Sequence, residues 1–327
     1  MNYRIFPRTG WRVSEIGLGC WQLGGDCWGD MDGGDANAIL QSSVDAGVNF
    51  FDTADVYGDG RSEEFIGRFI RECPEEIHVA TKLGRRSHVF PDQFTPENLR
   101  ACTEDSLRKL GLNTLDLTQL HCLPIEALRK GHVFEIMRDL QAEGKIRHWG
   151  VSVESMEEAL ICLGQEGCIS MQIIFNIFRQ KPVDTLFKKA EANGTALIIR
   201  LPLASGLLSG RMSTDQVFPE NDHRNFNRDG QHFNVGETFA GLPYPKGVQL
   251  ADELGTLLPD DIPMPQAALR WILDHEAVTV VIPGASRVDQ VKSNARASNT
   301  PSLPQDIHHK LRDFYTNRVH NHIRGSY

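Results

Sequence analysis

The chain has 327 residues, of which 40% are hydrophobic and 24% are charged, a composition typical of a folded protein with a full apolar core. Acidic residues outnumber basic ones by 43 to 34, for a formal charge of -9, so no nucleic-acid partner is expected. No stretch approaches the ~18 apolar residues of a membrane span, and the first residues lack the apolar region of a signal peptide. These features predict a cytoplasmic protein with no membrane partner.

Short β-like runs alternate with amphipathic helical runs along the chain. Most of these runs are continuously apolar, as strands buried on both faces of a parallel sheet must be. Length alone allows two domains, but eight strand-helix units favour a single (β/α)8 TIM barrel of the α/β class spanning residues 1–327. The expected strands are residues 15–21, 48–52, 77–82, 115–121, 146–152, 170–175, 196–200 and 278–284.

Two of the helices between these strands have recognisable ends. Thr95 is a candidate N-cap before Pro96, and Gly111 is the expected stop of that helix. In the same way, Asp35 is the expected start of the helix that Gly47 ends. After the seventh strand, residues 211–246 follow neither period. Their aromatic side chains favour an ordered flap over a linker, and such a flap is a candidate lid.

Polar side chains stand at or just beyond the ends of three successive strands. Asp52 ends the second strand, Lys82 the third and His121 the fourth, and Tyr57 follows Asp52 in the next loop. Because the active site of a TIM barrel lies at the carboxyl ends of its strands, we expect these four side chains to converge.

The four residue types suit the protonation of a carbonyl oxygen. An ammonium at Lys82 is expected to lower the pKa of the Tyr57 phenol, while Asp52 keeps that ammonium charged. His121 is placed to hydrogen-bond a substrate carbonyl. The carbonyl carbon must then receive a hydride, for which a nicotinamide is the natural donor.

The same residues also fit simpler interpretations. Taken singly, each strand-end residue is as consistent with a surface ion pair or a helix cap as with catalysis. Lys82 would also suit a Schiff-base isomerase or lyase, and Cys122 a thiol nucleophile, although no partner for that thiol is evident. The seven cysteines form no metal-ligand spacing, and His320 and His322 are expected to be exposed, so no metal site is predicted.

The chain resembles the aldo-keto reductase superfamily over nearly its whole length. Together these motifs are highly specific for it. The segments that carry the resemblance are GLGCW, GVNFFDTADVYGDGRSEEFIG, VATK, QLH, EGKIRHWGVS, PLASGLLSGR and VIPGASRVDQVKSN.

The resemblance implies a role for each of the four residues. Tyr57 is the general acid, Lys82 and Asp52 tune it, and His121 orients the carbonyl of a small-molecule substrate. The implied activity is NADPH-dependent reduction of an aldehyde or ketone. A second role also stays open, in which the chain binds NADP(H) and reports redox state to a partner, as the family's potassium-channel β subunits are thought to do. Neither role specifies an oligomeric state.

The resemblance also implies positions for the NADP(H) cofactor. Ser152 and Gln172 would hold the nicotinamide carboxamide, and Arg287 would bind the 2′-phosphate and so favour NADPH. The other expected cofactor residues are Gly19, Cys20 and Trp21 near the start, Leu203, Ser205, Gly206, Leu207 and Ser209 along the pyrophosphate, and Gly284, Ser286, Gln290 and Asn294 around the adenosine.

Two positions depart from the family pattern. Val153 stands where an asparagine commonly follows the serine of GVS, which removes one expected contact to the carboxamide. Arg200 stands where an aromatic side chain usually stacks on the nicotinamide, so it adds a positive charge beside a ring that becomes cationic on oxidation.

The substrate pocket is expected to come from loops, and the sequence does not identify the substrate. Aromatic side chains suit an apolar wall, and arginines suit an anionic group. The candidates are Trp21, Trp28, Phe90, Phe226 and Phe233 for the first, and Arg86, Arg224 and Arg228 for the second.

Overall fold

The computed structural model describes residues 1–327, and a sheet of eight parallel strands stands at its centre. The strands lie side by side in chain order, and isolated parallel bridges, Ile16 to Val281 and Gly19 to Gly284, join the last strand to the first. The predicted (β/α)8 barrel is therefore confirmed. Its strands are β3 (Leu18–Gly19), β4 (Phe50–Asp52), β5 (His78–Leu83), β6 (Leu115–His121), β7 (Ile146–Ser152), β8 (Cys168–Ile174), β9 (Ala196–Arg200) and β10 (Val278–Val281).

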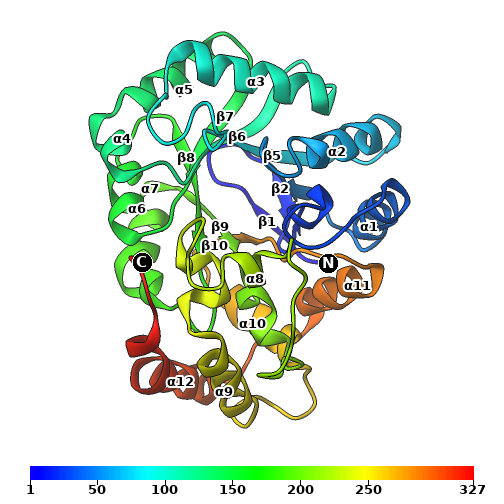
Figure 1. The fold of residues 1–327 in the computed structure, drawn as a ribbon, viewed down its shortest axis with the longest axis vertical. Helices are drawn as coiled ribbons and strands as arrows, with labels where there is room; N and C mark the ends of the chain where they lie inside the picture. The colour runs from blue at the N-terminus through cyan, green and yellow to red at the C-terminus, as the bar shows by residue number, and fades with distance from the viewer.

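Helices surround the sheet as an outer ring (Figure 1). Their apolar faces and the outer faces of the strands together form a core cluster of 77 buried residues. None of the helices is long and apolar enough to cross a membrane. The helices are α1 (Gly33–Asp45), α2 (Arg61–Glu72), α3 (Pro96–Leu110), α4 (Ile125–Lys130), α5 (His132–Ala142), α6 (Met156–Leu163), α7 (Lys188–Asn193), α8 (His223–Phe226), α9 (Tyr244–Gly255), α10 (Met264–Leu273), α11 (Val288–Arg296) and α12 (Gln305–Phe314).

An antiparallel hairpin of β1 (Tyr3–Ile5) and β2 (Arg12–Ser14) precedes the barrel, and the sequence analysis did not predict it. Its side chains Phe6 and Val13 belong to a second cluster of 10 buried residues, together with inward-facing strand residues such as Phe50 and Ile198. The barrel interior is therefore packed with side chains, as expected for this fold.

The helix ends follow local capping chemistry. Thr95 accepts a hydrogen bond from the backbone N–H of Asn98, and Gly111 adopts the left-handed conformation that ends α3, as predicted. The predicted start of α1 at Asp35 is wrong. Asp32 is the N-cap, and its carboxylate accepts the backbone N–H of Asp35, which lies in the first turn.

The long segment after β9 is ordered and contains short helical turns, among them α8, η4 (Val235–Glu237) and η5 (Phe239–Gly241). Its aromatic side chains pack on one another, with ring centroids 5.6 Å apart for Phe218 and Tyr244 and 4.7 Å apart for Phe239 and Tyr244. Because α9 begins at Tyr244, the irregular part ends at residue 243 rather than 246. We call residues 211–243 the flap segment.

Candidate active site

A cavity of about 840 Å³ opens at the carboxyl ends of the strands. The last residues of three strands line it, namely Asp52 of β4, His121 of β6 and Arg200 of β9. Tyr57, from the loop after β4, lines the same cavity. Three of the four predicted catalytic residues thus reach one space, which is the place where parallel barrels carry their chemistry.

The fourth residue, Lys82, lies fully buried behind Tyr57 and connects the group. Its Nζ donates to Asp52 Oδ1 at 2.5 Å, to the backbone oxygen of Thr53 at 2.7 Å and to the Tyr57 hydroxyl at 3.2 Å. The rings of Tyr57 and His121 meet edge to face, with centroids 5.9 Å apart. The structure therefore brings all four side chains together.

Asp52 is also held by two amides. Gln119 and Gln172 each donate to its Oδ2, at 3.1 and 2.7 Å. Gln119 was missed in the sequence, although it lies two residues before His121 on the same face of β6. Gln172 lines the cavity as expected, but its amide nitrogen is bound to Asp52. Together with Lys82, these contacts fix the orientation of the Asp52 carboxylate.

Protonation in this group differs in one respect from the sequence-based expectation. Burial raises the pKa of Tyr57 to about 12, and the nearby Lys82 ammonium offsets this only in part. The expected lowering of the Tyr57 pKa is therefore wrong for the protein alone, because burial disfavours the phenolate more than the Lys82 ammonium stabilises it. Tyr57 is protonated at neutral pH and has a proton to donate.

Lys82 and His121 differ in charge state. Burial alone would lower the pKa of Lys82, but Asp52 and Tyr57 more than offset this and raise it. Burial, reinforced by Lys82 and Arg85, lowers the pKa of His121 well below its usual value. Lys82 is therefore a permanent cation and His121 a neutral imidazole.

These states argue against the two nucleophilic alternatives. A Schiff base requires a neutral amine, whereas Lys82 is charged and buried. Burial raises the pKa of Cys122 to about 11, so its thiol is protonated at neutral pH.

Aromatic side chains form one wall of the cavity. Trp21 stacks on Tyr57 with ring centroids 5.9 Å apart, and it meets Trp28 edge to face at 5.6 Å. Phe90 and Phe233 also line the cavity.

The arginines proposed for an anionic group behave differently from one another. Arg224 lines the cavity but is held by the carboxylate of Asp222 at 2.6 Å. Arg86 and Arg228 are not among the lining residues, and neither is the fifth candidate aromatic, Phe226. Of these candidates, four of the five aromatic side chains line the cavity, but only one of the three arginines does.

Most of the residues expected around a dinucleotide lie along the rest of the cavity. The lining includes Gly19, Cys20, Trp21, Gln172, Arg200, Leu203, Ser205, Gly206, Ser209, Gly284, Ser286, Arg287, Gln290 and Asn294. Two of the predicted residues do not line it. Leu207 is buried in the hydrophobic core, and Ser152 is 2% exposed with its Oγ 3.5 Å from Cys122 Sγ.

The cavity fits a polar ligand. Three buried nitrogens of lining residues, Nε of Arg200, Nδ1 of His121 and Nε1 of Trp28, have no hydrogen-bond partner within the protein. Because a buried unpaired polar group costs free energy, all three suit a polar ligand.

At the far end of the cavity, the start of α11 is already capped. Gln290 Oε1 accepts the backbone N–H groups of Ser286 at 2.7 Å and Arg287 at 3.2 Å. A phosphate bound to these amides would have to displace Gln290.

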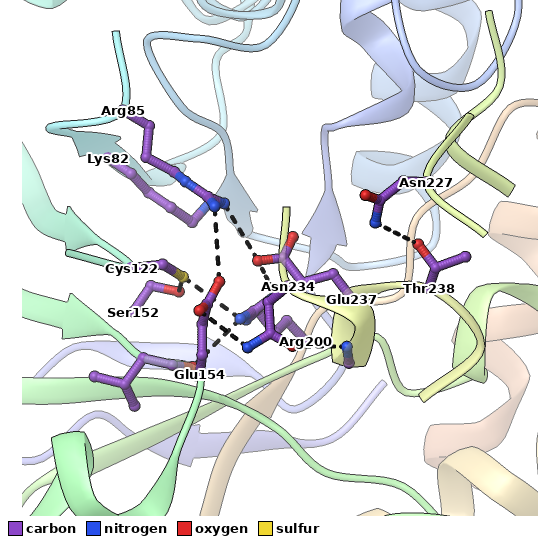
Figure 2. A network of polar contacts seen from close by, with 12 residues as sticks. Lys82, Arg85, Cys122, Ser152, Glu154, Arg200, Asn227, Asn234, Glu237 and Thr238 are labelled. Carbon is purple, nitrogen blue, oxygen red and sulfur yellow. Dashed lines mark hydrogen bonds and ion pairs between the residues drawn. The ribbon is translucent and has the colours of Figure 1, made fainter. Parts of the chain in front are cut away.

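A largely buried charged network that the sequence analysis missed borders the cavity beside His121. Arg85 lies 3.2 Å from Glu237 and 3.6 Å from Glu154, and Arg200 lies 3.5 Å from Glu237 (Figure 2). Arg85 and Glu154 each follow a strand end by two residues, a signal that could have found them. Glu237 belongs to the flap segment, where the sequence offers no such signal.

The two acids of this network, Glu237 and Glu154, differ in pKa. Burial opposes ionisation of Glu237, but Arg200 and Arg85 lower its pKa to about 2. Burial and the charge of Glu237 raise the pKa of Glu154 to about 7. The ligand atoms of Cys122, Glu154 and Glu237 lie within 4.8 Å of one another. However, the two arginines already supply the positive charge that a metal ion would bring.

Comparisons with known proteins agree with this geometry. The model of the Aldo/keto reductase family matches residues 15–316. The aldo-keto reductase YhdN of Bacillus subtilis is 29% identical over 301 residues, covering 90% of this chain and 87% of that protein.

Two solved structures share the fold along nearly their whole length. The holo form of an aldo-keto reductase from Bacillus halodurans is 26% identical, with a TM-score of 0.77 and 96% of each chain covered. A glycerol dehydrogenase from Gluconobacter oxydans is 29% identical, with a TM-score of 0.80, covering 100% of this chain and 98% of that one.

Proposed function

Because the chain belongs to the aldo/keto reductase family, we propose that it reduces an aldehyde or ketone to an alcohol, with NADPH as hydride donor and Tyr57 as proton donor. Membership of the family makes the chain an oxidoreductase of carbonyl compounds. The observation that carries the finer proposal is the contact of the Tyr57 hydroxyl with Lys82 Nζ, 3.2 Å away at the cavity wall.

The proton step follows from the charge states of the site. A carbonyl oxygen near the Tyr57 hydroxyl accepts its proton as negative charge develops on that oxygen. The Lys82 ammonium stabilises the phenolate left behind, and Asp52 keeps the ammonium in place. Neutral His121 donates a hydrogen bond to the same carbonyl oxygen and so orients the substrate. The aromatic wall of Trp21 and Trp28 favours a substrate with an apolar part.

The cofactor end of the proposal rests on the lining residues that the family resemblance assigns to a dinucleotide. A bound nicotinamide dinucleotide supplies the hydride, and family members generally bind such a cofactor. Gln172 and Arg200 would lie at the nicotinamide, Ser205 and Ser209 at the pyrophosphate, and Arg287 at the 2′-phosphate that distinguishes NADPH from NADH. Two residues of the predicted set lie outside the cavity lining, namely Ser152 at the carboxamide and Leu207 at the pyrophosphate.

We further infer that the whole chain acts as one catalytic domain in the cytoplasm, on a small-molecule carbonyl and without nucleic acid. The alternative role as an NADP(H)-binding redox reporter is not favoured. A protein that only reports redox state needs no protonated phenol beside a buried ammonium, and the site contains this pair in Tyr57 and Lys82.

Replacement of Tyr57 by phenylalanine tests the proposal. Tyr57→Phe removes only the proton donor, so turnover of the best substrate in a panel of aldehydes and ketones should fall by about 100-fold or more. Cofactor dissociation constants and thermal stability should stay unchanged. Tyr244→Phe is the matched control, since its buried hydroxyl donates to Ser213 outside the cavity. Near-normal kcat in Tyr57→Phe would refute the assignment.

A further inference from the structure

The flap segment places one carboxylate against the barrel wall of the active-site cavity. Glu237 is 5% exposed, and its Oε1 lies 3.5 Å from Arg200 Nη1 and 3.2 Å from Arg85 Nη1. In Figure 2 the Glu237 carboxylate lies between these two arginines. All three residues line the same cavity as Tyr57 and His121. A charge from the flap therefore stands beside the proposed reaction centre.

The backbone around Glu237 is fixed to the barrel side of the cavity. The hydroxyl of Ser205 donates to the backbone oxygen of Glu237 at 3.2 Å and accepts the N–H of Phe239 at 3.1 Å. Asn234, in the preceding turn, donates to Glu154 at 3.0 Å. These contacts hold the carboxylate of Glu237 at a defined position.

Among the acids that line the cavity, Glu237 is the one that forms an ion pair with Arg200. Four acidic residues line the cavity, namely Asp26, Asp52, Glu237 and Asp289. Asp52 is bound to Lys82 and Asp289 to Arg287, so their charges are balanced elsewhere. Arg200 is a largely buried cation at a strand end, with 12% of its side chain exposed. Without a counter-charge, its field would act on any ligand beside it.

The charge of the ligand changes during the proposed reaction. A nicotinamide ring is neutral when reduced and carries one positive charge when oxidised. It must lie near Tyr57 and His121 to deliver hydride to the carbonyl that they bind, which places it in the field of Arg200. An uncompensated guanidinium would weaken binding of the oxidised cofactor and leave the reduced form almost unaffected.

We propose that Glu237 is the counter-charge to Arg200 and sets the ratio of the affinities of the site for oxidised and reduced nicotinamide dinucleotide. This inference rests on the proposed function, since it assumes that the cavity holds such a cofactor. It gives the flap segment an electrostatic role in cofactor binding, which is separate from any role as a lid over the site.

Equilibrium binding of NADP⁺ and NADPH to the full-length chain tests the proposal without any turnover. In Glu237→Gln, the dissociation constant for NADP⁺ should rise about tenfold relative to that for NADPH, as expected for losing one charge in a partly buried site. Because loosening of the flap would affect both cofactors alike, the ratio reports on charge. Glu154→Gln is the matched control. It replaces the other acid bound to Arg85, which lies outside the cavity lining and, with a pKa of about 7, carries only part of a charge at neutral pH. It should therefore change the ratio less than about twofold.

A second variant, which removes Arg200 instead of Glu237, tests the proposal even if Glu237→Gln does not fold. Arg200→Met should shift the ratio towards NADP⁺, and the double variant with Glu237→Gln should return close to wild type. An unchanged ratio in the Glu237→Gln protein, or in Arg200→Met if the first variant does not fold, would overturn the inference while leaving the proposed function intact. No binding of either cofactor to the wild-type chain would overturn both.

Discussion

Arg287 shows how a residue expected to bind cofactor behaves in the protein alone. Its Nε and Nη2 donate to the two carboxylate oxygens of Asp289, at 3.0 and 3.1 Å, and both side chains are largely exposed. Exposed ion pairs of this kind are weak, whereas a phosphate accepts charge-assisted bonds from the same guanidinium. We therefore expect the 2′-phosphate of NADPH to displace Asp289.

This exchange gives a testable preference. Arg287→Ala should weaken NADPH binding by one to two orders of magnitude, roughly what one or two charge-assisted bonds contribute, and change NADH binding little. Asp289→Ala is the complementary variant and should strengthen NADPH binding, because the guanidinium no longer needs to change partner. Fluorescence titration with both cofactors measures each constant. Equal losses for NADPH and NADH in Arg287→Ala would contradict the assignment.

At the scale of single residues, the sequence predicts best those side chains that terminate strands. Asp52, Lys82 and His121 were found because a parallel barrel brings strand ends together whatever the loops do. Glu237 could not be found in this way, because its position depends on how an irregular segment folds back onto the barrel. The pKa of Tyr57 was also beyond the sequence, because burial, which only the packed structure determines, outweighs the effect of Lys82.

At the scale of elements, the flap segment is fastened by the C-terminal tail. Figure 1 shows the tail running from α12 back towards α6. Arg324 in this tail donates to the backbone oxygens of Gly241, Leu242 and Arg228, at 3.0, 3.2 and 3.3 Å, and to Asp229 Oδ1 at 2.6 Å. One side chain therefore joins two separate parts of the flap.

Loss of this side chain should loosen the flap. In Arg324→Ala, limited proteolysis should cut residues 211–243 about tenfold faster, since the side-chain hydrogen bonds that join the segment to the C-terminal tail are lost. Saturating NADPH should slow cleavage of both proteins, because the flap residues Arg211, Met212 and Phe233 line the cavity. Arg318→Ala, which removes an exposed ion pair of the same C-terminal region with Glu253, is the control. Equal cleavage rates for all three proteins would show that the tail does not hold the flap.

At the scale of the whole molecule, the alternation of strands and helices was sufficient to predict the barrel, but the lengths of its first and last strands were not. The run at 15–21 predicted a full strand, whereas β3 covers only Leu18–Gly19, and the run at 278–284 shortens to Val278–Val281. These two strands meet where the sheet closes, and they are joined by isolated bridges rather than by a continuous ladder. Closure depends on neighbouring strands and is not encoded in local periodicity.

Gly17 makes this closure possible, and its replacement gives a test. Its N–H donates to the backbone oxygen of Val281 at 2.8 Å, and a Cβ added there would lie 2.9 Å from the backbone oxygen of Phe50 and 3.1 Å from Ile282. Because strand backbone cannot move aside easily, Gly17→Ala should lower the free energy of unfolding by about 2 kcal/mol. Thermal unfolding without cofactor measures this as a drop of several degrees in the midpoint.

Gly164→Ala, where an added Cβ meets nothing within 4 Å, is the control and should leave the midpoint nearly unchanged. If both variants unfold at the wild-type midpoint, close packing at Gly17 does not limit closure of the barrel.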